Sequence, residues 1–584
     1  MTLTIAPPRR QAGPDAAVPP RPRRWPAALP LLLVAGTVAQ VLVRLWYAHA
    51  RTGPVANPDE TGYLVAARWL AGGPGGDLSG NTFYQGGYPL LLSPAYWVSH
   101  DPVTVYTLVT VINALFGAAL FPLGYAAARR FGLPRRAALP VSFAAALLPA
   151  TTFFGAYALA DAVLPTLVLA WLLALDRFAH GGGIPFAAAA SLAASYAAAV
   201  HTRGTVLLAV HVAALVAVAW TSRRVRAAAA GGAGAVAGYA AGAVLNALVQ
   251  SELYPDGTRD LAKILESRLT SMSGQGWALS GAAGQIWYLI VGTWGLAGLG
   301  LVAVTAVLVR RASATPDRIM AAVLLAGTAG VAYASSAALP DEHRVGNYAY
   351  GRYLSCVALV FALAGVAALV RAGSRTAAVR LTSAAVLTTL AAWLWVLAHA
   401  GDRLHTYNFI GFDFPEAMFL ADDRAALHPH KITFIAGGLL AGFLALSRLN
   451  ARHGATLAAA ALVGINVAAL TFSMGPSPRR IHPPPPLPGA EAGGVVADAS
   501  VGWVVRTRML YPVWWTRVGH FDVRDGLPPA PGVCTVLVSL PDGTHPKSTW
   551  PDHPAGWRPH TGGAQPYAWV AWRAPHCAGA EADQ

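Results

Sequence analysis

Long apolar runs recur along almost the whole chain, and they limit its possible folds more than any other feature. About thirteen of them approach the ~20 apolar residues that a helix needs to cross a bilayer. The chain is 55% hydrophobic and 12% charged, whereas soluble domains carry about 25% charged residues. It is therefore predicted to be a polytopic α-helical membrane protein, with spans at 29–47, 103–128, 137–154, 163–175, 186–200, 206–220, 227–249, 286–309, 319–339, 354–370, 381–398, 432–446 and 455–472.

Arginine clusters give these spans an orientation. One cluster precedes the first span and others lie in later connections, always on the same side of a thirteen-span path. Because basic residues near span ends stay in the cytoplasm, we expect a cytoplasmic N-terminus and a C-terminus on the outer face. This topology, with the basic tail, explains most of the formal net charge of +15, so no nucleic-acid partner is predicted.

The N-terminal segment imitates a cleavable signal peptide, with a basic start, an apolar stretch and Ala48-His49-Ala50. A secretory apolar core has only ~7–15 residues, whereas 29–47 is long enough to span the membrane, so we expect a retained first helix. Residues 1–25 are rich in Pro, Arg and Ala and are expected to form a disordered cytoplasmic tail. The membrane domain is predicted to occupy 26–473, followed by a Pro-rich linker at 474–488.

Residues 489–584 differ in composition from the membrane part and are predicted to form a small β-rich or α+β domain outside the membrane. Short β-branched or aromatic runs at 501–506, 533–540 and 567–572 are separated by Pro and Gly. Cys534 and Cys577 both lie in this domain, where an oxidising compartment would permit a disulfide between them. Cys356 lies in a span and is expected to be a buried apolar residue.

The first loop predicted to face outward, 51–102, carries an unusual pair of acids. It contains Asn57-Pro58-Asp59-Glu60, followed by Tyr63-Leu64, and it closes with Gly86-Gly87-Tyr88-Pro89-Leu90-Leu91-Leu92. A helix N-cap needs only one acid, and charge beside a membrane span is costly. The two adjacent carboxylates therefore suggest a functional role on the outer face.

The order of these motifs resembles the GT-C superfamily of membrane glycosyltransferases over about residues 29–472. Three later segments extend the resemblance: Tyr157-Ala158-Leu159-Ala160-Asp161, His201-Thr202-Arg203-Gly204 and Tyr350-Gly351-Arg352-Tyr353-Leu354. The chain is most similar to the protein O-mannosyltransferase and aminoarabinose transferase branch and to actinobacterial arabinofuranosyltransferases. The segment 250–285 lacks a further diagnostic motif, which leaves the branch open.

The resemblance implies a polyprenyl-phosphate sugar donor and a first-loop acid that acts as a base or binds a metal. Transfer from a lipid phosphate needs a base near the acceptor and positive charge near the departing phosphate. Asp59 is the expected base, with Glu60 beside it as a second catalytic candidate, and Asp59 and Asp161 are candidate oxygen ligands of Mg²⁺, Mn²⁺ or Ca²⁺. The candidate substrate-binding residues are Asp161, Arg203, His343, Tyr350, Arg352 and Tyr88.

Simpler roles stay open for several of these residues. Asp161 would also suit a helix N-cap, Arg352 an interfacial anchor or phospholipid contact, and His343 a solvated loop. Arg203 would also suit a purely structural turn between two spans.

The sequence therefore predicts a bacterial plasma-membrane glycosyltransferase, a hexosyl- or pentosyltransferase, that moves a sugar to a glycan, lipid or protein acceptor on the outer face. Bacterial origin is inferred from the bias toward Arg over Lys and toward Ala and Gly. The main alternative is a transporter or flippase of a lipid-linked or cell-envelope substrate. Transporters place ionisable residues near mid-membrane, whereas this chain has its acids at the ends of spans, which favours an enzyme. A catalytically silent scaffold would tolerate any change of Asp59.

Overall fold

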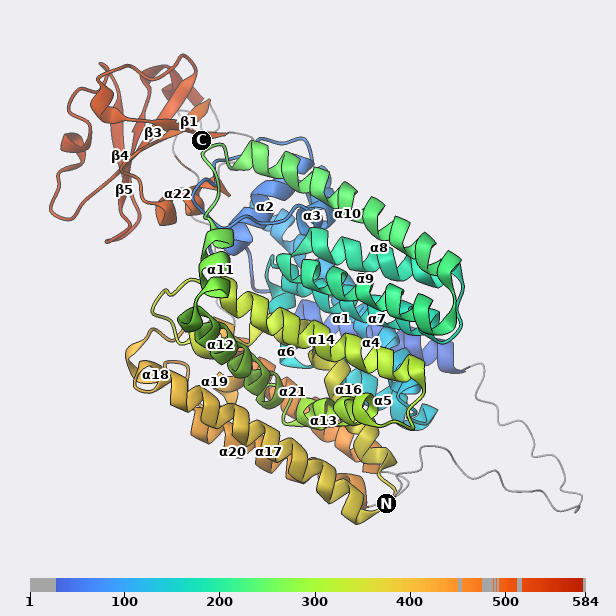
Figure 1. The fold of residues 1–584 in the computed structure, drawn as a ribbon. Coiled ribbons are helices and arrows are strands. Elements are labelled where there is room, and N and C mark those ends of the chain that lie inside the picture. The colour runs from blue at the N-terminus through green and yellow to red at the C-terminus, as the bar shows by residue number, and fades with distance from the viewer. Residues whose placement is uncertain are drawn as a thin grey trace, which may run out of the picture.

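The computed structural model describes residues 28–449, 454–474, 487, 490, 493–511 and 517–580. It is a bundle of long helices with a small sheet domain at one end (Figure 1). This confirms the predicted polytopic helical fold with a C-terminal α+β domain. The tail predicted at 1–25 and most of the linker predicted at 474–488 lie outside the described residues.

Each predicted span contains helix. Nine helices of the described ranges are long and apolar enough to cross a membrane, or up to eleven if two bent pairs count as one span each. Two further apolar helices, α7 and α8, have 16 and 17 residues and are shorter than a usual span. The unbent helices are α1 (Ala28–Ala48), α4 (Pro102–Arg130), α7 (Leu164–Ala179), α8 (Ile184–Val200), α9 (Thr202–Ser222), α10 (Val225–Leu253), α14 (Thr315–Ala338), α16 (Ser355–Arg371), α17 (Arg375–Ala400), α20 (Pro429–Leu449) and α21 (Gly454–Met474).

Two predicted spans are bent rather than straight. In 137–154, α5 (Arg135–Ala146) and the segment Pro149–Ala156 meet at 63°. Leu148 is extended there because the ring of Pro149 disfavours a helical residue before it. In 286–309, α12 (Met272–Val291) and α13 (Leu296–Val309) meet at 114°, and Gly295 adopts a φ of +86° at the bend.

Short helices fill the connections at the end of the bundle opposite the arginine clusters. The first loop contains α2 (Asp59–Leu70) and α3 (Gly87–Val98). Residues 60–68 of α2 are buried, so α2 is packed inside the protein rather than lying along the membrane interface. The other short helices of these connections are α6 (Pro149–Thr152), η1 (Phe154–Ala156), η2 (Ala160–Ala162), α11 (Leu261–Thr270), α15 (Gly346–Ala349), η3 (Arg352–Leu354), α18 (Arg403–Thr406), η4 (Gly411–Asp413) and α19 (Pro415–Ala421).

The arginine-rich connections meet at one end of the bundle, which we call the basic end. Arg130 at the end of α4 pairs with Asp176 at 2.8 Å and with Asp317 at 2.7 Å. Arg371 at the end of α16 donates a hydrogen bond to the carbonyl of Phe131 at 2.9 Å. These contacts agree with the prediction that an even number of spans separates successive arginine clusters, so that all of them lie on one side. That the basic end faces the cytoplasm stays a prediction.

The C-terminal domain is a five-stranded mixed sheet with strand order β2-β1-β3-β5-β4. Strand β1 pairs in parallel with β2 and β3, and the pairs β3·β5 and β5·β4 are antiparallel. The run at 501–506 is not a strand as predicted but part of a helix, α22, because the parallel pair β1 and β2 needs a crossover connection. The elements are β1 (Gly494–Asp498), α22 (Trp503–Leu510), β2 (Val518–Phe521), η5 (Val523–Asp525), β3 (Val533–Ser539), η6 (Pro546–Thr549), β4 (Arg558–Gly562), β5 (Trp569–Arg573) and η7 (Pro575–Ala580).

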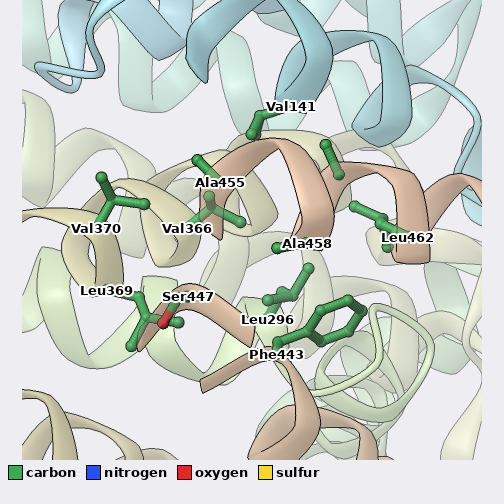
Figure 2. A pocket seen from close by; sticks show the side chains of 11 residues that line it. Val141, Leu296, Val366, Leu369, Val370, Phe443, Ser447, Ala455, Ala458 and Leu462 are labelled. Carbon is green, nitrogen blue, oxygen red and sulfur yellow. The ribbon is translucent and has the colours of Figure 1, made fainter. Parts of the chain in front are cut away.

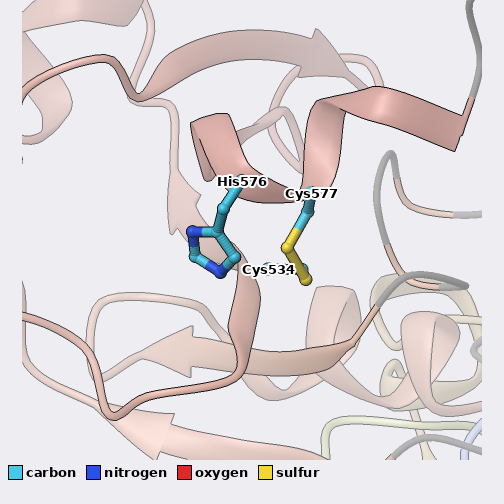
Figure 3. Close-up of side chains that lie close together, drawn as sticks. All are labelled: Cys534, His576 and Cys577. Atoms are coloured by element: carbon cyan, nitrogen blue, oxygen red, sulfur yellow. A yellow bond between two sulfur atoms is a disulfide. The ribbon is translucent and has the colours of Figure 1, made fainter.

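Two features of the C-terminal domain bear on function. Cys534 in β3 and Cys577 form a disulfide (Figure 3), whereas Cys356 is buried in α16. The domain contacts the first loop, because Arg68 of α2 donates to the carbonyl of Leu510 at 3.1 Å. The C-terminal domain thus lies at the end of the bundle that carries Asp59, the first residue of α2.

Candidate active site

Arg352 lies at the centre of an ion-pair cluster at the end of α16 away from the basic end. Its Nη2 is 2.7 Å from Oδ2 of Asp59, and its Nε is 2.9 Å from Oδ2 of Asp161. Its Nη1 is 3.9 Å from Oδ1 of Asp413. We call these four residues, with Arg203, the Arg352 cluster. They come from five separate segments: α2, η2, the start of α9, η3 and η4.

Asp161 lies between two guanidinium groups. Arg203 Nη2 is 2.6 Å from its Oδ1, and the two side chains are only 2% and 1% exposed. Burial opposes ionisation of Asp161, but Arg203 and then Arg352 outweigh this and lower the pKa of Asp161 to about 2. Arg203 also donates through Nη1 to the carbonyl of Tyr353 at 3.1 Å. Asp161 and Arg203 therefore orient Arg352 rather than reach outward.

Asp59 is the accessible acid of the cluster. Its side chain is 32% exposed, whereas those of Asp161 and Asp413 are 1% and 7% exposed. The hydroxyl of Tyr84 donates to Oδ1 of Asp59 at 3.1 Å. Asp59 is the first residue of α2, and Pro58 occupies the N-cap position, so Asp59 is not the N-cap of α2. The helix start still favours a negative charge there.

Glu60, the predicted second catalytic acid, is completely buried and has a different set of contacts. Its Oε1 accepts hydrogen bonds from two backbone amides of the preceding loop, at 2.7 Å each. Its Oε2 accepts from the amide of Ala158 at 2.8 Å and from the hydroxyl of Tyr106. These four donors match the four acceptor sites of a carboxylate, so Glu60 ties the first loop to the rest of the protein.

The remaining predicted residues divide into one member of the site and two that lie elsewhere. The hydroxyl of Tyr350 donates to Oδ1 of Asp413 at 3.3 Å. Tyr88 is completely buried, and its hydroxyl donates to Oδ1 of Asn113 at 2.9 Å. His343 is exposed on its loop, with its ring 5.2 Å from that of Tyr407. The structure thus brings together Asp59, Asp161, Arg203, Tyr350 and Arg352.

Asp413 and Arg344 were missed by the sequence reasoning. Burial raises the pKa of Asp413 to about 6, and Arg352 and then Arg344 oppose this rise. The sequence signal for Asp413 was a single acid between aromatic residues in the last outer connection. Arg344 directly follows His343, and His343 was the residue of this loop that was predicted to bind substrate.

The cluster as arranged does not fit a divalent cation between Asp59 and Asp161. Hard cations take six or more oxygen ligands, whereas Arg352 is paired with both carboxylates and Arg203 with one of them. Two other groups in the described part of the chain bring potential ligand atoms within 4.8 Å of one another: Asp77 with Asp256 and His520, and Cys534 with His576 and Cys577. In the second group the sulfurs are joined in the disulfide (Figure 3).

An apolar crevice elsewhere in the bundle has a different character. It lies among α5, α13, α16, α20 and α21 and borders the basic end, where α16 and α20 finish (Figure 2). The polar side chain among its described lining residues is Ser447, so it offers no acid or base. The lining residues are Val141, Leu296, Val366, Leu369, Val370, Phe443, Ser447, Ala455, Ala458, Ala459 and Leu462.

Comparison with protein-family models and with curated proteins finds no match. Among solved structures, the chain is similar to ArnT from Cupriavidus metallidurans bound to undecaprenyl phosphate, with 15% identity over 95% of this chain and 99% of that chain and a TM-score of 0.54. ArnT in the apo state has 14% identity over the same shares and a TM-score of 0.49. Arabinosyltransferase EmbB from Mycobacterium smegmatis has 16% identity over 75% of this chain and 41% of that chain, with a TM-score of 0.40. The likeness to undecaprenyl-phosphate-bound ArnT shows that the chain shares the fold of ArnT, a member of one of the branches that its motifs resemble.

Proposed function

We propose that this protein is a glycosyltransferase that moves a sugar from a polyprenyl-phosphate donor to an acceptor on the outer face of a bacterial plasma membrane. The observation that carries the proposal is the Arg352 cluster, in which an accessible acid, Asp59, lies 2.7 Å from a guanidinium. The cluster lies among the connections predicted to face outward. ArnT, which shares the fold, was solved with undecaprenyl phosphate, a polyprenyl phosphate.

The chemistry needs a base and a phosphate site side by side. Asp59 Oδ takes the proton of the acceptor hydroxyl as the acceptor oxygen forms its bond to the anomeric carbon of the sugar. The bond from that carbon to the phosphate oxygen breaks, and its electron pair leaves on the polyprenyl phosphate. Arg352 stabilises the negative charge that develops on the departing phosphate.

The present pairing of Arg352 has a consequence for donor binding. Asp59 already accepts a hydrogen bond from Nη2 of Arg352, and the Asp161 carboxylate forms an ion pair with its Nε at 2.9 Å. A phosphate therefore gains a guanidinium edge when it replaces one of these acids, and Asp59 is the exposed one. The exchange releases Oδ2 of Asp59 from Arg352 beside the donor, where it can accept a proton, while Tyr84 still donates to Oδ1.

Asp161 and Arg203 have a supporting role in this scheme. Both side chains are almost completely buried, which keeps them from direct contact with a substrate. Their ion pair holds Nε of Arg352 while Nη2 exchanges partners. Glu60 also supports the site, because it fixes the loop that precedes α2 and so the position of Asp59 at the start of that helix.

The test uses purified protein in detergent with polyprenyl-phosphate mannose, arabinofuranose and aminoarabinose as donors and a bacterial envelope extract as the source of acceptors, and it measures the transfer of labelled sugar and the release of polyprenyl phosphate. Wild type is expected to turn over one of these donors, and Asp59→Asn to be slower by at least about 100-fold. The control is Asp402→Asn, an exposed acid of the last outer connection.

Two results would contradict the proposal. Full turnover by Asp59→Asn would remove Asp59 as the base. Wild type that turns over no donor but moves labelled donor across a vesicle bilayer would be a flippase. The sugar and the acceptor are identified in the same assay by the donor that is consumed and by the product that carries the label.

A further inference from the structure

Tyr63 of α2 carries a hydroxyl that the protein itself does not use. The residue is only 4% exposed, and its hydroxyl forms no hydrogen bond with any of the described residues. The neighbouring tyrosines of the first loop differ, since the hydroxyl of Tyr84 donates to Oδ1 of Asp59 at 3.1 Å. The hydroxyl of Tyr96 donates to the carbonyl of Leu64 at 2.8 Å. Because a buried hydroxyl without a partner costs free energy, the one on Tyr63 calls for an explanation.

The oxygen of this hydroxyl can be reached from outside the protein. Several side-chain atoms in the described ranges are fully enclosed and lack a hydrogen-bond partner, such as Oε1 of Glu416, but the hydroxyl oxygen of Tyr63 is not one of them. An unpartnered oxygen that is not enclosed touches solvent. A ligand can therefore contact the hydroxyl of Tyr63 although the rest of the side chain is buried.

Tyr63 lies one helical turn after Asp59, on the same face of α2. Residues four apart are neighbours on a helix, and helical side chains lean toward the N-terminus, so the ring of Tyr63 extends toward the turn that carries Asp59. The ring contacts agree, because the centroid of Tyr63 is 5.2 Å from that of Tyr84, whose hydroxyl is bound to Asp59. The ring of Tyr88 lies 5.1 Å away. These two edge-to-face contacts hold the Tyr63 ring in place beside the Arg352 cluster.

The charges of the Arg352 cluster act on this hydroxyl and keep it protonated. Burial raises the pKa of the Tyr63 hydroxyl, and Asp59 and then Asp161 raise it further. Arg352 and Arg203 oppose this rise. The hydroxyl is therefore neutral at neutral pH and can both donate and accept a hydrogen bond. That pair of capacities matches the hydroxyls of a sugar, whereas a phosphate is bound more strongly by a guanidinium.

We propose that the hydroxyl of Tyr63 binds a ring hydroxyl of the sugar that the donor carries. The inference rests on the proposed function, because it names the contact at the sugar end of the same donor. In that function Arg352 binds the phosphate and Asp59 faces the acceptor, so the sugar lies beside Asp59. A hydroxyl one helical turn along α2 is within reach of such a sugar. Tyr63 thus contributes to the choice of the sugar and not to the binding of the lipid phosphate.

The experiment compares the affinities of the purified protein for two lipids in detergent by titration calorimetry. One lipid is undecaprenyl phosphate, and the other is whichever of polyprenyl-phosphate mannose, arabinofuranose and aminoarabinose the wild type binds most tightly. Tyr63→Phe removes only the hydroxyl. It is expected to weaken binding of the sugar-bearing lipid about three- to tenfold, as the loss of one neutral hydrogen bond does. Its affinity for undecaprenyl phosphate should stay within about twofold of wild type.

Tyr96→Phe is the matched control. Tyr96 is also a buried tyrosine of the first loop, but its hydroxyl is bound to a backbone carbonyl. This variant is expected to have a lower melting temperature and unchanged affinity for both lipids. Tyr63→Phe should keep or raise the melting temperature, because it removes a buried hydroxyl that has no protein partner. A merely structural role of Tyr63 would give the reverse, a lower melting temperature with both affinities unchanged.

The outcomes separate the two proposals. Equal losses for both lipids in Tyr63→Phe would place the hydroxyl at the phosphate and overturn the sugar contact. Unchanged affinity for both lipids would overturn any contact of Tyr63 with the donor. Wild type that binds none of the three sugar-bearing lipids contradicts the proposed function itself, whatever its affinity for undecaprenyl phosphate.

Discussion

Arg352 and Asp59 form an ion pair at 2.7 Å although 293 residues separate them in the chain. The pair joins a nearly buried cation to the most exposed acid of the cluster. Arg352 is 8% exposed and Asp59 is 32% exposed, so a ligand reaches the acid before the guanidinium. A phosphate that replaces Asp59 on Arg352 would therefore be bound and would at the same time free the Asp59 carboxylate to act as the base.

Replacing Arg352 by Lys is expected to lower kcat/KM for the donor by about 100-fold. Lysine keeps the charge, but a single ammonium cannot contact Asp161 and the phosphate along two edges as a guanidinium does. The measurement is donor turnover at several donor concentrations. The control is Arg371→Lys at the other end of α16, which should leave turnover unchanged; equal activity of both variants would contradict the role of Arg352.

Replacing Arg203 by Ala is expected to destabilise the protein by about 3 kcal/mol. The change leaves the Asp161 carboxylate buried with only Arg352 as a partner, and breaking one side of a buried ion pair costs about 3–5 kcal/mol. The measurement is the free energy of unfolding in a denaturing detergent. The double variant Arg203→Gln with Asp161→Asn should recover part of the loss, because it removes the uncompensated charge; no recovery would contradict the pairing.

Glu60 and Asp59 are expected to respond differently to loss of their charge. Glu60→Gln replaces one acceptor oxygen by an NH₂ group that faces N–H donors, which leaves buried donors unpaired at about 1–3 kcal/mol. Its melting temperature should fall. Asp59→Asn should lower turnover with little change of melting temperature, since Asp59 is partly exposed. A stable Glu60→Gln protein would show that the four contacts of Glu60 do not hold the loop.

The raised pKa of Asp413 predicts a pH dependence of stability. Burial lifts the pKa from 3.8 to about 6, so the folded protein favours the protonated form. This contribution is fully present below about pH 4 and is lost as the pH rises through about 6. Asp413→Asn stays neutral, so its melting temperature relative to wild type should be higher at pH 8 than at pH 4. An unchanged difference between the two pH values would contradict the shift.

Treatment with a chelator tests whether a divalent cation takes part. In the present arrangement guanidinium groups occupy the oxygens that Asp59 and Asp161 would offer to Mg²⁺, Mn²⁺ or Ca²⁺. Donor turnover is therefore expected to survive incubation with excess EDTA. Turnover that is lost and then restored by one of these ions would mean that the cation displaces Arg352 from the acids.

The sequence predicted the site in part because several of its residues belong to local motifs. Asp59, Asp161, Arg203, Tyr350 and Arg352 all lie in segments that resemble a known family, and the structure brings them together. Asp413 lies in a connection without such a motif, and Arg344 lies outside the Tyr350–Leu354 motif of its own connection. The place of Asp413 in the cluster comes from its distance of 3.9 Å to Arg352, which no local sequence pattern contains.

The sequence also could not separate Asp59 from Glu60. Both are acids at the start of the same helix, and successive helical side chains point about 100° apart. One therefore faces the cluster while the other faces the buried loop. Which acid faces which side depends on how α2 packs, and α2 is buried along residues 60–68.

By itself the sequence determined that the chain spans a membrane many times, since a backbone in lipid must satisfy its own hydrogen bonds and long apolar runs do so as helices. Composition likewise separated the C-terminal domain, and the arginines marked one end of the bundle. The tertiary structure alone decided the bends at 63° and 114°, the helix at 503–510 and the membership of the Arg352 cluster. The physical reason is that ion pairs and packing join segments that are far apart in the chain, whereas the hydropathy pattern depends only on residues that are close together in it.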